Sequence, residues 1–462
     1  MIISQNGGIF MVKIDEKVYG KAKASLEMLF DTATFVELGA YTKRTCDGAD
    51  FEGVICGYGA VNGKLTFAFA QESGRAKGSF SERHYKKIAN LYELAVKNGA
   101  PVVGVFDSAG AVVYDGAEAL ASYGRFMKLV SDASGIIPQI AVINGICGGS
   151  SALIASMFDI TLTLKGVSKL FVNSPFVVGE CDTAKSGISA FEAESESELF
   201  GFAKTLICAL PSNNADGAYC ENGDDMNRAV SFDAGEYSAE TLVKTLSDNG
   251  SFIRLYSAYT ENAVLGFASF GGITVGVAAS EKDAVLDINT ARAMSRLISF
   301  CDSFAIPVLT LVDSVGLDLS LEAEKAAYAS ELARLAYAYT ASSNAKLTVV
   351  VGKAYGAAFT LLGSKALGAD MAYALPDAEI SVLSPEASVA FVWNDRVGEQ
   401  SREELEAEWK EKCASASEAC YKGEIDDIVK PEELRARICA AFSMLASKAE
   451  GHPTRRHANM PL

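Results

Sequence analysis

The residues best suited to chemistry lie in a glycine-rich stretch, residues 144–151, which reads Asn-Gly-Ile-Cys-Gly-Gly-Ser-Ser. Residues 136–143 before it predict a buried strand, and residues 150–158 after it predict a buried helix. Glycines at such a corner let main-chain N–H groups face a ligand, and the helix N-terminus adds partial positive charge. The corner could therefore bind a phosphate or stabilise the oxyanion of an enolate or tetrahedral centre. The alternative is that the glycines only allow close packing of the helix on the sheet.

The same pattern occurs a second time in the chain. Residues 349–359 again predict a strand, a glycine and a helix, with Gly356 in the place of Gly148. Residues 101–110 also match residues 307–316, because a proline, an Asp-Ser pair and a glycine each recur 206 positions later. An offset this constant indicates two copies of one α/β unit in a single chain.

Two further segments could contact a ligand. Asp107 and Ser108 open a turn at the carboxyl end of the strand 101–106, and ligands of α/β folds gather at such ends. Residues 74–79 form a Gly/Ser loop that carries Arg75 and Lys77, which could meet an anionic ligand. A solvated loop without a ligand is the alternative for this segment.

The apolar periodicity predicts helices and strands in both copies. Asn62 and Gly63 predict the turn of a β-hairpin. Helices are expected at residues 21–30, 84–98, 117–131, 192–209, 238–247, 287–304, 321–340, 403–420 and 431–447.

Composition limits the class of protein. The 462 residues suit two domains, 1–235 and 236–462. The net charge of −17 argues against nucleic acid or an anionic membrane as the main partner. No apolar run reaches the roughly 18 residues of a membrane span, and the N-terminus lacks a signal-peptide pattern. Ten cysteines without a C-x-x-C pair or zinc spacing predict reduced thiols and a cytoplasmic protein with no metal site.

Several short motifs together point to one family. They lie at residues 107–111, 134–140, 145–150, 210–214, 287–288, 300–307, 353–356, 423–429 and 457–462. With them the chain resembles, from about Ala22 onward, the carboxyltransferase subunits of biotin-dependent acyl-CoA carboxylases and decarboxylases. That family includes the propionyl-CoA carboxylase β chain and the α chains of methylmalonyl-CoA and glutaconyl-CoA decarboxylases.

The resemblance implies an α/β fold of two tandem crotonase-like domains, each a ββα superhelix, related by an internal duplication. The first would hold the acyl-CoA thioester, and the second, from a neighbouring subunit, would hold biotin. The expected assembly is a homo-oligomer, usually a hexamer built as a dimer of trimers. Expected partners are a biotin carboxyl carrier protein and either a biotin carboxylase or membrane decarboxylase subunits, without insertion of this chain into the membrane. The carrier would be separate, because residues 126–129 (Phe-Met-Lys-Leu) lack a biotin-attachment motif.

The resemblance also implies a mechanism. Carboxyl transfer between biotin and the α- or vinylogous carbon of a short acyl-CoA would pass through a thioester enolate and a biotin ureidate, which can itself act as the base. Two backbone oxyanion holes would stabilise them, each donor contributing roughly 3 kcal/mol. By position, Gly149 and Ser150 match the first hole, and Ala357 and Ala358 match the second. Expected acyl-CoA contacts are Arg75, Gly78, Ser108, Ala109, Gly110, Ala111 and Gly148, and expected biotin contacts are Gly316, Tyr355 and Gly356.

The chain departs from the family pattern at several positions. Ser150 and Ala357 stand where the family usually has glycine, and Val112 stands where it usually has arginine. Residues 313–317 lack the Val-Pro-Gly-Phe turn, and a Gly-Gly-Ala block and a histidine are missing before Ser186. These departures leave two alternatives open. One is a biotin-independent crotonase-type hydratase or hydrolase, with Asp107 and Asp313 as candidate acid–base carboxylates, and the other is a non-catalytic structural paralogue.

Overall fold

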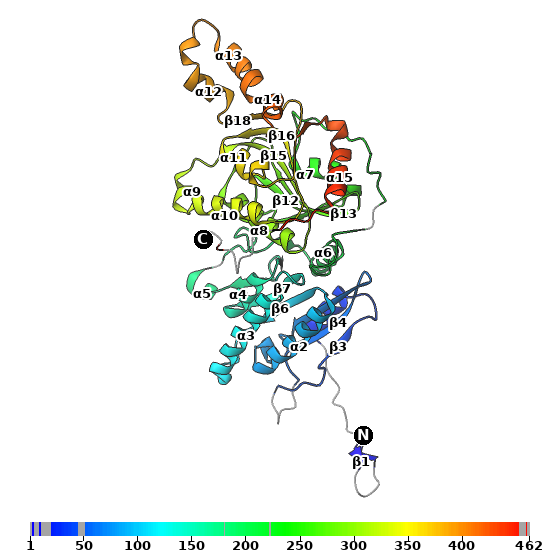
Figure 1. Cartoon of the computed structure of the whole chain (residues 1–462). Helices are drawn as coiled ribbons and strands as arrows, with labels where there is room; N and C mark the ends of the chain where they lie inside the picture. The colour runs from blue at the N-terminus through cyan, green and yellow to red at the C-terminus, as the bar shows by residue number, and fades with distance from the viewer. Residues whose placement is uncertain are drawn as a thin grey trace.

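A computed structural model of the chain describes residues 2–3, 9–10, 20–44, 51–179, 181–220, 223–451 and 459. It contains an eight-stranded sheet in the first half and a nine-stranded sheet in the second. The two sheets form the lower and upper parts of the molecule in Figure 1. A separate pair of short strands, β1 (Ile2–Ile3) and β2 (Ile9–Phe10), lies near the N-terminus. The motif at 457–462 falls almost wholly outside the described residues.

The first sheet combines one hairpin with a parallel set of strands. Strands β4 and β5 are antiparallel and turn at Asn62 and Gly63, which confirms the predicted hairpin. The spatial order is β10-β8-β7-β6-β5-β4-β3, and β9 pairs with the end of β7. The strands are β3 (Val36–Leu38), β4 (Val54–Val61), β5 (Lys64–Gln71), β6 (Val102–Ser108), β7 (Gln139–Gly148), β8 (Ile160–Leu164), β9 (Lys169–Phe171) and β10 (Phe191–Ala193).

Helices pack against this sheet. They are α1 (Lys21–Leu29), α2 (Glu82–Asn98), α3 (Ala117–Ala133), α4 (Ser150–Met157), α5 (Pro175–Val178) and α6 (Glu196–Ala209). Ser81 caps α2 by accepting the His84 amide, as N-terminal serines commonly do. The helix predicted from residue 192 begins later, because residues 191–193 form β10 and pair in parallel with β8.

The second sheet repeats the arrangement of the first. Strands β15 and β16 correspond to β6 and β7, and β18 pairs with the end of β16 as β9 does with β7. Both copies shift register at the aspartate, between Phe106 and Ser108 and between Val312 and Ser314. The strands are β11 (Ile253–Leu255), β12 (Ala263–Phe270), β13 (Ile273–Ser280), β14 (Ala284–Leu286), β15 (Val308–Leu317), β16 (Lys346–Tyr355), β17 (Met371–Ala374), β18 (Glu379–Ser381) and β19 (Asp427–Ile428).

Two of the long helices predicted in the second half are interrupted. The helix predicted over 321–340 breaks at Ala327, which has a positive φ of 62°. The helix predicted over 403–420 contains a π-helical turn, Lys410–Ala414, and belongs to the helices α12 to α14 that project from the second sheet in Figure 1. The helices are α7 (Ala239–Leu246), α8 (Ile288–Ser303), α9 (Leu321–Lys325), α10 (Tyr328–Ala341), α11 (Ala357–Leu361), α12 (Pro385–Val392), α13 (Arg402–Trp409), α14 (Ala416–Tyr421) and α15 (Leu434–Leu445). No helix in the described part of the chain is both long and apolar enough to cross a membrane.

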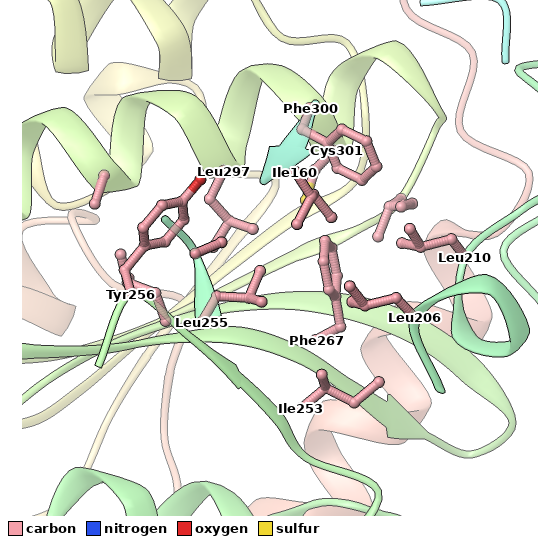
Figure 2. Close-up of a cluster of buried hydrophobic side chains, with 14 of the residues drawn as sticks. Ile160, Leu206, Leu210, Ile253, Leu255, Tyr256, Phe267, Leu297, Phe300 and Cys301 are labelled. Carbon is pink, nitrogen blue, oxygen red and sulfur yellow. The ribbon is translucent and has the colours of Figure 1, made fainter. Parts of the chain in front are cut away.

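An apolar core joins the two halves. Figure 2 shows Leu206 and Leu210 of α6 beside Phe267 of β12 and Phe300 of α8. Burying such side chains removes apolar surface from water, at roughly 1.5–3 kcal/mol each. Across the same boundary, Arg296 of α8 donates to the carbonyl of Phe158 at 2.7 Å. The halves therefore pack directly on each other.

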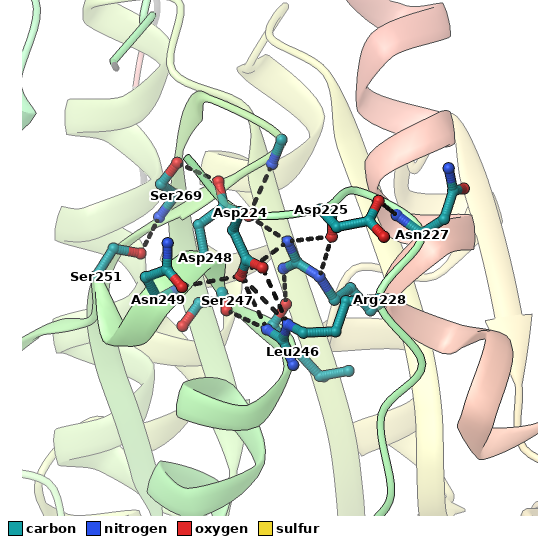
Figure 3. Close-up of polar contacts among 12 residues, drawn as sticks. Asp224, Asp225, Asn227, Arg228, Leu246, Ser247, Asp248, Asn249, Ser251 and Ser269 are labelled. Atoms are coloured by element: carbon teal, nitrogen blue, oxygen red, sulfur yellow. Dashed lines mark hydrogen bonds and ion pairs between the residues drawn. The ribbon is translucent and has the colours of Figure 1, made fainter. Parts of the chain in front are cut away.

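A buried network of ion pairs and hydrogen bonds links the segment between α6 and α7 to the second half (Figure 3). The fully buried Arg435 of α15 donates to Asp248 Oδ1 and to the Leu246 carbonyl, both at 2.6 Å, and lies 3.2 Å from Asp224. Arg228 pairs with the same Asp224 at 3.1 Å. Contacts with the second half thus begin upstream of residue 235, and the domain boundary at that residue stays a prediction.

Candidate functional site

The first glycine corner leaves two backbone donors unpaired. Gly149, with φ 58° and ψ −124°, joins β7 to α4. Its amide donates to the Phe171 carbonyl of β9 at 2.8 Å. The amides of Ser150 and Ser151, at the start of α4, donate to no group among the described residues. Unpaired N–H groups at a helix N-terminus are suited to an anionic oxygen.

The second corner has the same geometry. Gly356, with φ 58° and ψ −140°, joins β16 to α11, and its amide donates to the Ser381 carbonyl of β18 at 2.9 Å. The amides of Ala357 and Ala358 likewise donate to nothing in the described part of the chain. Neither Ser150 nor Ala357 has a positive φ, so a side chain at either position does not disturb the backbone donor.

This geometry corrects the alignment of the two copies by one residue. Gly356 corresponds to Gly149, so the predicted match with Gly148 is wrong. The first copy has two adjacent glycines where the second has one, and residue identity alone does not tell which of them has the unusual backbone angles. Gly148 serves packing, because a Cβ there would lie 2.7 Å from the Phe171 ring. The Gly149 amide already has a partner, so the equivalent donor pairs are Ser150 with Ser151 and Ala357 with Ala358.

An aspartate braces each corner against the next strand. Asp107 Oδ1 accepts the Ile146 amide at 3.2 Å, and a Cβ on Gly145 would lie 2.1 Å from the same oxygen. Asp313 Oδ1 accepts the Lys353 amide at 2.9 Å. The equivalent Gly352 would place a Cβ 2.3 Å from the Asp313 carboxylate. Both carboxylates therefore shape the backbone of the corners that follow them.

The second oxygen of each aspartate carboxylate also accepts a hydrogen bond. Ser73 Oγ donates to Asp107 Oδ2 at 2.7 Å, and the Tyr237 hydroxyl donates to Asp313 Oδ2 at 2.8 Å. Burial raises the pKa of Asp313, although hydrogen bonds from the Lys353 amide and Tyr237 oppose this. These contacts give both carboxylates a structural role at the corners.

The turn after Asp107 lies directly beside the first corner. In the β6–β7 register Ser108 is opposite Cys147. Ser108 is buried, and its hydroxyl accepts the Gly110 amide at 3.1 Å. The Ala109 amide donates to the Lys77 carbonyl at 2.9 Å, whereas the Ala111 amide has no partner among the residues described. The Ala111 amide in this predicted substrate turn is thus available to a ligand.

The loop at residues 74–79 packs against this turn. A Cβ on Gly78, which has φ 63°, would lie 2.4 Å from the Asp107 carbonyl oxygen. The Arg75 guanidinium instead lies 5.8 Å from the centre of the Phe51 ring. The structure therefore brings Gly78 to the predicted substrate turn and directs the charge of Arg75 towards an aromatic ring.

A cavity of about 330 Å³ adjoins the first corner. Its walls are formed by Ala152 and Ser156 of α4, by β9, and by residues of α5 and the following segment. The Tyr123 hydroxyl and Ser151 Oγ are 3.1 Å apart beneath the corner. Small and apolar side chains dominate this wall.

Charged and hydroxyl groups surround the second corner. A cavity of about 460 Å³ is lined by Tyr355 with Lys353, Glu379 and Lys410. The Tyr355 hydroxyl donates to Glu379, which pairs with Lys410 at 2.7 Å. Burial raises the pKa of Tyr355, and the Glu379 contact raises it further. Gly316, predicted as a biotin contact, follows Ser314, whose hydroxyl accepts the Gly316 amide at 3.3 Å.

Sequence reasoning missed four residues that shape these corners: Ser73, Tyr237, Glu379 and Lys410. Each meets its partner across a long stretch of chain; Tyr237 and Asp313, for example, are 76 positions apart. No motif contains them, and the internal repeat that located the aspartates gives no signal for partners that differ between the copies.

The chain matches known proteins over most of its length. Residues 21–460 match the family model described as "Carboxyl transferase domain". The methylmalonyl-CoA decarboxylase subunit alpha of Veillonella parvula is 33% identical over 96% of this chain and 93% of its own length. The mitochondrial propionyl-CoA carboxylase beta chain of Homo sapiens is 32% identical over 96% and 88%.

Solved structures agree as well. A transcarboxylase 12S crystal structure with bound methylmalonyl-coenzyme A and methylmalonic acid is 29% identical, with a TM-score of 0.90 over 96% of this chain and 92% of that one. Its match confirms the predicted fold of two tandem crotonase-like units. The chain belongs to the carboxyl transferase family and is an acyl-CoA carboxyltransferase.

Proposed function

We propose that this chain is a cytoplasmic carboxyltransferase subunit that moves a carboxyl group between biotin on a separate carrier protein and a short acyl-CoA. The observation that carries this proposal is the duplicated corner, which offers two unpaired backbone amides in each half. A reaction in which negative charge develops on two different oxygens would use one such pair of amides for each oxygen.

In the first half, the amides of Ser150 and Ser151 hold the thioester oxygen as the α-carbon takes on carbanion character. These donors point along the axis of α4, so the helix dipole adds to them. Each preorganised donor contributes roughly 3 kcal/mol to stabilising the enolate. The small side chains of the adjoining cavity suit a compact acyl group.

In the second half, the residues present fit a ureido ring. The amides of Ala357 and Ala358 are unpaired donors for its carbonyl oxygen, and the adjoining cavity of about 460 Å³ has room for a small bicycle. Biotin, when bound, carries the transferred carboxyl group on a ring nitrogen. The contacts of Glu379 with Tyr355 and Lys410 fix the wall beside these donors and keep the tyrosine hydroxyl protonated.

We further propose a homohexamer, built as a dimer of trimers, in which the second corner of one subunit serves the first corner of its neighbour. The related transcarboxylase 12S forms a hexamer. Equivalent helices of the two units expose large apolar side chains, Phe176 of α5 at 101% and Phe391 of α12 at 84%. Apolar exposure of this kind is typical of contact surfaces. The remaining partners are the carrier protein and a biotin carboxylase or membrane decarboxylase subunits.

The experiment that tests this proposal is decarboxylation of malonyl-, methylmalonyl- and glutaconyl-CoA by the purified chain, with and without millimolar free biotin. Loss of CO₂ from one ester only when biotin is present is the expected result. Turnover that does not depend on biotin would instead support a hydratase- or hydrolase-type enzyme. Binding of the esters without any turnover would support a non-catalytic paralogue.

A further inference from the structure

A cavity of about 420 Å³ lies where the two halves meet. Its described lining comes from α4 and residues 186–188 of the first half, and from α8, α10 and two tyrosines of the second. Three cations, Arg292, Arg296 and Arg334, line it, and no acidic side chain is among its described lining residues. Arginines gathered on one concave surface attract an anion, although the chain as a whole carries a net charge of −17.

Two of these arginines share a single carboxylate. Glu331 Oε1 lies 3.1 Å from Arg292 Nε, and Glu331 Oε2 lies 3.5 Å from Arg334 Nη1. The second contact is an ion pair without a hydrogen bond, and the buried Arg334 Nε has no acceptor among the described residues. A buried donor that lacks an acceptor indicates a bound water or ion. The Arg334 guanidinium is thus available to a ligand in the cavity.

The third arginine keeps its charge. Arg296 donates to the main-chain carbonyls of Phe158 at 2.7 Å and Asp159 at 3.2 Å, which are neutral acceptors. Burial of the nearby Asp159 carboxyl raises its pKa to about 7, although the Gln139 amide and Arg296 oppose this. Within the described part of the chain, three guanidinium groups therefore contact one carboxylate, that of Glu331, and lie near a second. The cavity keeps a net positive charge even when Asp159 is ionised.

The lining suits a phosphate group. A phosphate monoester carries nearly two negative charges at neutral pH and three strong acceptor oxygens. Guanidinium groups bind such oxygens through paired N–H donors. Tyr256, Tyr259 and Ser299 line the same cavity and carry hydroxyl groups that can also donate. A volume of about 420 Å³ is within the range of small-molecule sites.

The cavity is connected to the first corner through one helix. Ser156 of α4 lines both this cavity and the cavity at the first corner. Arg296 holds the Phe158 carbonyl just after the C-terminal end of α4, and the unpaired amides of Ser150 and Ser151 lie at its N-terminal end. Neither of these two serines lines the cavity. An anion on the arginines would therefore contact the supports of α4 and not its amide donors.

We propose that this cavity binds a small phosphate-bearing ligand through Arg292, Arg296 and Arg334, at a site separate from the acyl-CoA and biotin sites. The bound phosphate joins α8 and α10 to the first half. The site does not depend on the proposed function, because no step of carboxyl transfer passes through it.

Titration calorimetry of the full chain with inorganic phosphate, at constant ionic strength, tests this site. Arg334→Gln is expected to weaken binding about tenfold, because it removes a charged donor and keeps a polar side chain. Ser299→Asp, which retains all three arginines and adds a negative charge to the cavity, should weaken binding at least as much. Arg125→Gln is the matched control, since Arg125 is a helical arginine 3.9 Å from Glu82 that does not line the cavity. Phosphate should also raise the Tm of the wild-type and Arg125→Gln proteins more than that of Arg334→Gln.

Three probes distinguish the possible ligands: inorganic phosphate, glycerol 3-phosphate and succinate. Binding of inorganic phosphate alone would support the free ion, and tighter binding of glycerol 3-phosphate would support an esterified phosphate. Succinate that binds more tightly than either would overturn the phosphate assignment. Wild-type protein that binds no phosphate, or an Arg334→Gln variant that binds it as tightly as Arg125→Gln, would overturn the site. Displacement of phosphate by a CoA ester would also overturn it, because the cavity would then belong to the acyl-CoA site.

Discussion

The two corners share a backbone and differ in their surroundings. Each has a positive-φ glycine whose amide is taken by a short neighbouring strand, followed by two unpaired amides. In the first copy the bracing carboxylate of Asp107 meets Ser73 and lies 3.8 Å from Lys21. In the second copy the equivalent Asp313 meets Tyr237, and its pKa is raised by burial.

The walls differ even more than the braces. Mostly apolar and small polar side chains, with the cation Lys169, line the cavity at the first corner, whereas Lys353, Glu379 and Lys410 line the cavity at the second. The backbone therefore offers the same pair of unpaired amides twice, whereas the side chains around the two pairs differ. The two copies therefore share the backbone conformation of the corner and differ in the side chains that line the cavity beside it.

The largest effect is expected from removing a backbone amide at either corner. Ser150→Pro and Ala357→Pro each remove one amide donor at the first residue of a helix, where proline is tolerated. Each variant is expected to lower kcat about 10²–10³-fold, the effect of losing one oxyanion donor. The measurement is biotin-dependent decarboxylation, with KM determined separately for the CoA ester and for free biotin.

The controls for these variants keep the amide and change only the side chain. Ser150→Ala and Ala357→Ser should retain kcat within a few-fold, because neither position needs glycine. A loss confined to one of the two proline variants would show that only one corner works as an oxyanion hole. The proposed equivalence of the two halves would then be wrong.

The next largest effect concerns the close approach of each aspartate to the following strand. Gly145→Ala and Gly352→Ala would place a Cβ 2.1 Å and 2.3 Å from the Asp107 and Asp313 carboxylates. The carboxylates must move, so each variant should lower the free energy of unfolding by about 2–4 kcal/mol. Gly124→Ala in α3, with nothing within 4 Å of its Cβ, is the control and should be neutral or stabilising by up to about 1 kcal/mol. Thermal melting that fails to separate Gly145→Ala or Gly352→Ala from this control would contradict the bracing role.

Local patterns in the sequence predicted much of the fold. The Asn62–Gly63 hairpin, the helices of the first half and the repeated aspartates follow from turn chemistry, periodicity and spacing, which act over a few residues. The same local patterns also predicted one continuous helix over residues 321–340. The break at Ala327 was not predictable, because alanine favours helix and residues other than glycine rarely adopt the positive φ of 62° found there.

The position of the first glycine corner was predicted, but not which of its backbone amides are unpaired. Neighbouring glycines at 148 and 149 look alike in sequence, and only the structure shows that Gly149 has the positive φ and an amide held by Phe171. The donors therefore move to Ser150 and Ser151. Partners such as Tyr237 and Glu379 reach the corners through side chains from distant elements, which spacing within one motif does not encode.

A smaller effect on stability is expected from removing the hydroxyl groups that donate to Asp107 and Asp313. Tyr237→Phe removes the hydroxyl at 2.8 Å from the buried Asp313 carboxylate and should cost about 1–3 kcal/mol of stability. Ser73→Ala removes the equivalent donor from Asp107, but Lys21 lies 3.8 Å from the same carboxylate oxygen. The serine variant should therefore be milder in chemical unfolding. Equal losses in the two variants would show that Lys21 does not compensate.

The smallest expected effect is a difference in acid response between the halves. Burial alone would raise the pKa of Glu52 in the first half, but His84 and hydrogen bonds from Gly53 and Ser81 lower it to about 2. A depressed pKa contributes stability that is present above the ordinary value near 4.5 and lost as the pH falls towards 2. Asp313 in the second half has a raised pKa. Its contribution to the free energy of unfolding is therefore complete below pH 3.8 and is lost only as the pH rises through the pKa of the folded state.

Lowering the pH from 6 to 3.5 should therefore loosen the first half relative to the second, by on the order of 1 kcal/mol because only part of the Glu52 window is crossed. Hydrogen exchange of β4 and α2, which surround Glu52, should accelerate more than exchange of β15 and β16, which surround Asp313. Glu52→Gln should flatten this response, since the amide does not titrate. If both sheets accelerate together in wild-type protein, the acid response belongs to the shared apolar core and not to Glu52.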